Sequence, residues 1–140
     1  MNIVDKLMTI DAGKILERPT ETMEIKRLSN LLGEPFLIKL QAVHPQRYTE
    51  IQSMAVDLNK KGHINNVDIY KQNTHMILAS LVEPNIKDRK LLDHFKAATP
   101  VDLIGKLFLA GEIDEINKKI NEISGFNDEE TEKIKDEIKN

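Results

Sequence analysis

The sequence contains no cysteine, and aromatic residues make up only 4% of its 140 residues. The absence of cysteine excludes disulfide bonds, thiolate zinc sites and cysteine nucleophiles, and it is typical of proteins from reducing compartments. Because aromatic rings are so few, the core must consist mainly of leucine, isoleucine, valine and methionine. A chain of this length corresponds to one domain, which buries about two thirds of its unfolded surface.

Long apolar runs and an excess of positive charge are also missing. Apolar stretches such as 76–79 and 107–110 fall far short of the ~20 residues that a membrane helix needs. Charged residues occur throughout positions 1–18, so no signal-peptide core is present. The net charge of -3 does not favour binding to a nucleic-acid backbone. We therefore expect a cytoplasmic protein that binds neither membranes nor nucleic acids.

The first 18 residues predict an amphipathic arm. Apolar residues recur there at helical spacing, at Ile3, Leu7, Ile10, Ile15 and Leu16. Pro19 ends the pattern. A helix with so few turns is not stable alone, so we expect the arm 1–18 to dock on another surface.

The next segment has the two-residue period of β-strands. Alternating positions between Phe36 and Val43 are apolar, and a similar alternation begins at Met23. Gly33 and Pro35 lie between the two stretches and are typical turn residues. The segment 22–43 therefore predicts a β-hairpin with a long connection, which should lie against helices.

Helical periodicity follows Pro45. The first predicted helix ends at the cations and glycine of 60–62, as helix carboxyl ends prefer. A second helix begins near residues 65–66 and continues to Val82, because Pro84 stops it.

A short helix that contains Leu91, Leu92 and Phe95, and then two further helices, precede a charged tail. Thr99 and Pro100 are typical of a helix start. A later isoleucine stripe comprises Ile113, Ile116, Ile120 and Ile123. Gly125 predicts a left-handed cap, after which Phe126 can fold back onto the stripe. The segment 127–140 predicts an acidic, mostly solvated carboxy-terminal helix. The expected class is α+β: a mainly α-helical single domain with five or six helices and one amino-terminal β-hairpin.

Titratable residues concentrate between positions 80 and 95. They are Glu83, Lys87, Asp88, Arg89, Asp93 and His94. One interpretation is an unrecognised metal-dependent hydrolase that uses His94, Asp88 and Glu83. The favoured interpretation is a polar corner between helices, in which Pro84 ends one helix and Asn85 caps the next.

Other chemical motifs are incomplete. The histidines at 44, 63, 75 and 94 do not show the i, i+4 spacing of a helical zinc site. The stretch LIGKLF lacks the glycine at 100 and the hydroxyl residue at 107 of a phosphate-binding loop. The segment 87–109 could form a helix-turn-helix in a small DNA-binding or regulatory protein, but acids interleave with its cations. We assign no catalytic, cofactor-binding or metal residue and expect no cofactor.

Several ordered phrases resemble the XkdN-like tail assembly chaperones of long-tailed bacteriophages, prophages and phage-tail-like particles. The phrases are EIKRLSNLLGEPFLIKLQAV (24–43), RYTEIQ (47–52), LVEPNIKDRKLLDHF (81–95), TPVDLIGKLFLAGEI (99–113) and INEISGF (120–126). The resemblance implies that 19–126 is a tail-assembly-chaperone-like domain, between the arm 1–18 and the acidic helix 127–140.

The resemblance also implies a non-enzymatic function. Members of this family bind the tape measure protein, keep it soluble and help to recruit tail-tube subunits, in many phages through a frameshifted longer product. They act in the host cytoplasm and are absent from the mature particle. The tape measure protein, the tail-tube protein and further copies of the chain are therefore the expected partners. An apolar groove with a polar rim would suffice to bind a tape measure helix, and the five methionines could line one.

Overall fold

The computed structural model describes residues 2–58 and 61–126. Its elements are α1 (Ile3–Met8), α2 (Ala12–Leu16), β1 (Thr20–Glu24), α3 (Lys26–Leu32), β2 (Leu37–Gln41), α4 (Pro45–Met54), β3 (Val56–Leu58), β4 (Ile64–Val67), α5 (Ile69–Ser80), β5 (Leu81–Glu83), α6 (Arg89–His94), α7 (Pro100–Leu107) and α8 (Ala110–Ile123). The expected α+β class with an amino-terminal hairpin is confirmed, but the described residues form eight helices instead of the expected five or six. The predicted helix at 127–140 lies outside the described residues.

A small antiparallel sheet has the strand order β1-β2-β5. The β1–β2 pair is in register from Thr20 opposite Gln41 to Glu24 opposite Leu37. Alternate residues of the central strand β2 point into the core, and Ile38 and Leu40 are completely buried. The sheet thus supplies one wall of the core, which helices close on the other side.

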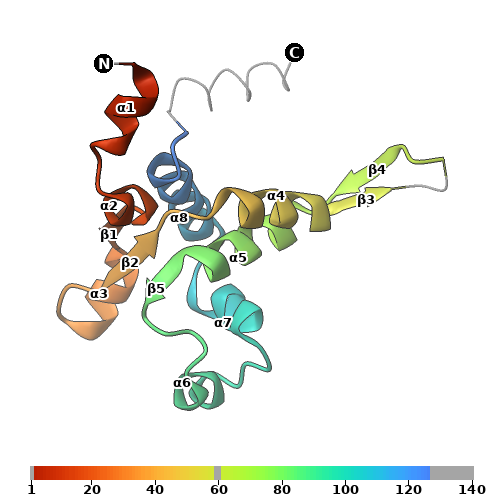
Figure 1. Ribbon diagram of the computed structural model, residues 1–140. Helices are drawn as coiled ribbons and strands as arrows, with labels where there is room; N and C mark the ends of the chain where they lie inside the picture. The colour runs from red at the N-terminus through yellow and green to blue at the C-terminus, as the bar shows by residue number, and fades with distance from the viewer. Residues whose placement is uncertain (1, 59–60, 127–140) are drawn as a thin grey trace.

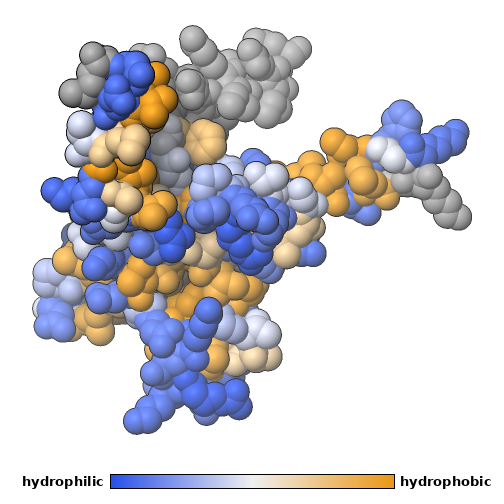
Figure 2. All heavy atoms as spheres, viewed as in Figure 1, coloured by the Kyte–Doolittle hydropathy of each residue, from blue (hydrophilic) through white to orange (hydrophobic). Residues whose placement is uncertain are grey.

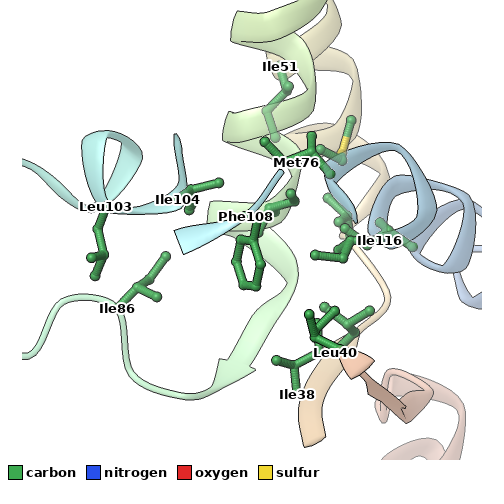
Figure 3. Close-up of a cluster of buried hydrophobic side chains, with 14 of the residues drawn as sticks. Ile38, Leu40, Ile51, Met76, Ile86, Leu103, Ile104, Phe108 and Ile116 are labelled. Atoms are coloured by element: carbon green, nitrogen blue, oxygen red, sulfur yellow. The ribbon is translucent and has the colours of Figure 1, made fainter. Parts of the chain in front are cut away.

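Helix α5 lies at the centre of the helical layer and packs against α4, α7 and α8 (Figure 1). Figure 3 shows side chains from β2, α4, α5, α7 and α8 converging on one cluster. Its completely buried aliphatic residues are Ile38, Leu40, Ile51, Ile77, Leu103, Ile104, Ile116 and Ile120. This aliphatic core agrees with the scarcity of aromatic residues.

Two parts of the chain project from this core. Helices α1 and α2 form the arm on one side, and the β3–β4 hairpin extends on the other (Figure 1). Neither α1 nor α2 contains a buried residue. Apolar atoms lie exposed on both projections in Figure 2. The predicted docking of the arm therefore does not occur within the described chain.

The connection between β1 and β2 contains a helix that the sequence analysis did not predict. Helix α3 ends at Gly33, which adopts the left-handed conformation with φ of 78°. The Ser29 hydroxyl accepts the Phe36 N–H at 2.8 Å and donates to Glu24 Oε2 at 2.8 Å. These bonds hold α3 against the ends of the two strands. Gly33 is therefore a helix cap as well as part of the connection.

The predicted helix from Pro45 to 60–62 was too long. Helix α4 ends at Met54, and a second hairpin, β3–β4, follows it. Gly62, with φ of +81°, lies between these strands and does not end a helix. The prediction failed because Ala55 and Leu58 continue the helical spacing, although Val56 and Leu58 also fit a strand.

The boundaries around α5 and α6 also differ from the prediction. Helix α5 begins at Ile69 and ends at Ser80, and the residues expected to finish it form β5 instead. The Ser80 hydroxyl donates to the Gln41 carbonyl at 2.7 Å, which joins the helix end to the sheet. Asp88, not Asn85, caps α6, since its carboxylate accepts the Leu91 N–H at 3.1 Å.

The predicted start of α7 and the predicted end of α8 are confirmed. Thr99 Oγ1 accepts the Asp102 N–H at 3.1 Å at the start of α7. Gly125 has φ of 102°, and the Phe126 N–H donates to the Asn121 carbonyl at 2.9 Å. This pattern is a Schellman cap. The Phe126 ring packs against Tyr48 of α4, with ring centroids 5.1 Å apart.

Candidate binding groove

The titratable residues of 80–95 form a polar corner. A hollow of about 400 Å³ there is lined by Pro84, Asn85, Asp88, Lys90, Leu91 and His94. Glu83 is not among the lining residues, and within the described part of the chain His94, Asp88 and Glu83 do not form a group that could hold a metal ion. Asp88 is engaged as the α6 cap, and Arg89 pairs with Asp93 at 3.4 Å.

The histidines do not gather either. The His44 ring accepts the Gln46 N–H at 3.3 Å at the start of α4, and His75 lies on α5, with Nδ1 2.8 Å from the Lys71 carbonyl. In residues 2–58 and 61–126 no group of three or more histidine, aspartate or glutamate side chains is placed to hold a metal ion. The described residues therefore offer no geometry on which metal chemistry can be built.

An apolar groove lies beside this corner. It has a volume of about 230 Å³, and every lining residue is apolar: Leu28, Leu31, Leu32, Phe36, Pro84, Leu91, Phe95 and Leu107. These residues come from α3, α6, the end of α7 and the segments beside them. We call this hollow, with its eight lining residues, the α3–α6 groove.

Helix α3 presents leucines at one edge of the groove. Leu31 is 75% exposed and Leu32 is 59% exposed, whereas Leu28 packs against the core. Phe95, at the end of α6, also lines the groove and is 38% exposed. Large apolar side chains that gather at a concave surface mark a binding site for a protein or ligand.

An arginine also holds α3 in position. The Arg27 guanidinium donates to Glu112 Oε2 from Nε at 3.1 Å and to Oε1 from Nη2 at 2.9 Å. Nη2 also donates to the Leu107 carbonyl at 2.6 Å. The hydrogen bond from Arg27 holds the pKa of Glu112 below its usual value, and the same bond raises the pKa of Arg27. This ion pair connects α3 to α8 and to the carboxyl end of α7.

The sequence contained a signal for this groove. Leu28, Leu31 and Leu32 have the i, i+3, i+4 spacing of an amphipathic helix. The sequence analysis assigned them to the hairpin connection, and so it did not assign an apolar face to them. Their proximity to Phe95, more than 60 positions away, could not be seen without the fold.

The sequence matches a family model across almost its whole length. The model describes the phage XkdN-like tail assembly chaperone protein, and it matches residues 4–139. The chain belongs to the XkdN-like tail assembly chaperone family. The resemblance seen in the ordered phrases is thereby confirmed.

A solved structure has the same fold. The crystal structure of the protein YqbN is similar with a TM-score of 0.63 and 18% sequence identity, covering 84% of this chain and 93% of YqbN. At this identity the likeness concerns the fold alone. No curated protein matches the sequence. Among the described residues, no helix combines the length and apolar character that crossing a membrane requires.

In this family member, a second hollow near the carboxyl end of α8 is less suited to an apolar partner. It is lined by Val43, Pro45, Tyr48, Thr49, Gln52, Ser124 and Phe126. The Tyr48 hydroxyl donates to Asn121 Oδ1 at 3.0 Å, and burial raises the pKa of Tyr48. The mixture of polar and apolar lining makes the α3–α6 groove the stronger candidate.

Proposed function

We propose that the protein is a non-enzymatic tail assembly chaperone that binds the tape measure protein through the α3–α6 groove. In this proposal it keeps the tape measure protein soluble and helps to recruit tail-tube subunits around it. The observation that carries the proposal is the wholly apolar lining of the groove together with the exposure of Leu31 and Leu32. Family membership supports the general role in tail assembly.

The apolar lining of the groove suits the apolar face of an amphipathic helix. Such helices bind to grooves through apolar anchors at positions i, i+3 or i+4, and i+7. A long helical partner would aggregate if its apolar stripe stayed exposed, and a groove that covers the stripe prevents this. Each apolar side chain that becomes fully buried contributes about 1.5–3 kcal/mol, so a few leucines can offset the cost of association.

The proposal includes the cellular context. The protein acts in the bacterial host cytoplasm, is left out of the mature particle and uses no cofactor. A metal-dependent hydrolase at the 80–95 corner is less favoured, because Asp88 caps α6 and Glu83 lies outside the hollow. A DNA reader within 87–109 is less favoured because Asp93 and Asp102 pair with Arg89 and Lys106.

The test is co-expression with the tape measure protein of the same phage or phage-like particle. The wild-type chain should co-purify with it and raise its soluble fraction, whereas Leu31→Asp and Leu32→Asp should reduce both. Leu58→Asp is the matched control for Leu32→Asp, because Leu58 is 57% exposed, close to the 59% of Leu32, but lies on β3 and does not line the groove.

Two results would contradict the proposal. If no complex forms with the wild-type chain, tape measure binding is wrong. If Leu32→Asp binds normally while Leu58→Asp does not, the protein binds its partner through the β3–β4 hairpin and not through the groove. Circular dichroism of each variant separates loss of binding from loss of fold.

A further inference from the structure

The α3–α6 groove adjoins the polar hollow of the corner. Pro84 and Leu91 line both cavities, so the two adjoin across these side chains. A segment that lies along the groove and extends across these side chains would pass from a purely apolar section to one that also contains Asn85, Asp88, Lys90 and His94. This inference rests on the proposed function, because it concerns the segment that the groove binds.

Positive charge in the polar section lacks partners. Throughout the part of the chain that the structure describes, Lys90 forms no ion pair, and the same holds for Lys87 and Lys96 at the two ends of α6. The acid of this hollow, Asp88, directs its carboxylate to the Leu91 N–H. Among the described residues, Lys90 is thus an exposed cation of this hollow that no ion pair neutralises.

We propose that the groove binds an amphipathic helix that carries an acidic side chain one turn beyond its apolar anchors. The anchors fill the apolar section between α3 and Phe95. The carboxylate lies in the polar section, where the Lys90 ammonium and the His94 ring can donate hydrogen bonds to it. Because residues three or four apart share a face of a helix, anchors and acid occur in one stripe. The charge thus sets the direction in which the helix lies.

The probes are synthetic alanine-rich helical peptides with leucines at i, i+4 and i+7 and with Glu, Gln or Lys at i+11. The Glu peptide should bind the full chain about two- to fivefold more tightly than the Gln peptide, as expected for an exposed ion pair. The Lys peptide should bind least. Added salt should reduce these differences, because it screens exposed charges.

Substitutions of single lysines test whether Lys90 is the cation that binds the acidic side chain. Lys90→Gln should bring the three peptides to similar dissociation constants, and Lys90→Glu should make the Lys peptide the tightest. Lys71→Gln is the matched control, since Lys71 is an exposed cation on α5 outside the groove, and it should leave the order unchanged.

The outcomes separate this inference from the proposed function. Equal binding of all three peptides, lost in Leu32→Asp, overturns the acidic requirement and leaves the groove as the binding site. A charge preference that persists in Lys90→Gln also overturns the assignment. If no peptide binds, the inference is wrong, and the co-expression experiment then decides whether tape measure binding itself holds.

Discussion

Arg27 shows how one side chain can position a binding surface. Its guanidinium joins the Glu112 carboxylate and the Leu107 carbonyl, so α3 cannot move independently of α7 and α8. Leu31 and Leu32 stay at the edge of the groove for this reason. The Arg27 side chain is 36% exposed, so solvent weakens the pair, but the Glu112 side chain is only 16% exposed and the paired hydrogen bonds give a defined geometry.

The Glu112 carboxylate predicts a pH dependence of stability. Its pKa is lower in the folded chain than the ordinary 4.5, so the stabilisation is complete above pH 4.5 and is lost as the pH falls through the folded value. Glu112→Gln should therefore lower the free energy of unfolding at pH 7 and approach the wild type in strong acid. Denaturant unfolding between pH 7 and 3 measures this. A difference that does not change with pH would contradict it.

The Thr99 cap allows a second prediction. Thr99→Ala removes the acceptor of the Asp102 N–H and should lower the free energy of unfolding by about 1 kcal/mol. Thr99→Ser keeps the hydroxyl and serves as the control. Thermal unfolding of the two variants checks the prediction, and equal losses in both would show that the methyl contact and not the cap matters.

Among the elements, the β3–β4 hairpin differs from the core because its apolar side chains are exposed. Leu58 and Ile64 form a cross-strand pair on one face, and both are exposed. Leu58→Thr with Ile64→Thr should change the free energy of unfolding by no more than about 0.5 kcal/mol, as usual for surface positions. Ile116→Ala on α8, where the side chain is completely buried, should cost about 2–5 kcal/mol. Urea unfolding compares them, and a large loss in the hairpin variant would mean that the hairpin packs on the domain.

Elements with one strong local signal could be predicted from the sequence. Thr99 and Pro100 mark the start of α7, and Gly125 marks the end of α8, since capping depends on a few neighbouring residues. The stretch after Met54 could not be assigned in this way, because its apolar residues fit a helix and a strand. Pairing of Val56 with Val67 decides in favour of the strand, and this tertiary contact is absent from the local pattern.

The candidate groove was harder to predict than the fold. Its parts come from α3, Pro84 and α6, and each is an ordinary short amphipathic element. The sequence pattern indicated the charged residues of 80–95 as a candidate site instead. These residues lie beside the groove, where Lys90 and His94 line the adjoining hollow. The sequence therefore indicated the correct region of the chain. The apolar surface beside this region could be recognised only from the fold.

At the scale of the whole molecule, the arm leaves apolar surface uncovered. Its exposed large apolar residues are Ile3, Val4, Leu7, Met8, Ile10, Ile15 and Leu16. Helices as short as α1 and α2 are marginal without packing. A second copy of the chain, or the tape measure protein, can supply the missing contact.

We predict that the purified protein self-associates through this arm. Light scattering should show a mean mass above that of one chain, rising with concentration. Removal of residues 2–16 should lower the mass toward the monomer. It should leave the thermal unfolding of the remaining domain almost unchanged, because α1 and α2 contain no buried residue and Arg18, which donates to the Ala42 carbonyl at 3.4 Å, is kept.

A substitution variant controls for the shortened chain. Leu7→Glu with Ile15→Glu keeps the length of the arm but places charge on its apolar positions, so it should reduce association as the truncation does. Leu58→Glu on the hairpin should not. A wild-type chain that stays strictly monomeric at high concentration would contradict the prediction. If the hairpin variant alone becomes monomeric, the apolar face of β3–β4, and not the arm, joins the copies.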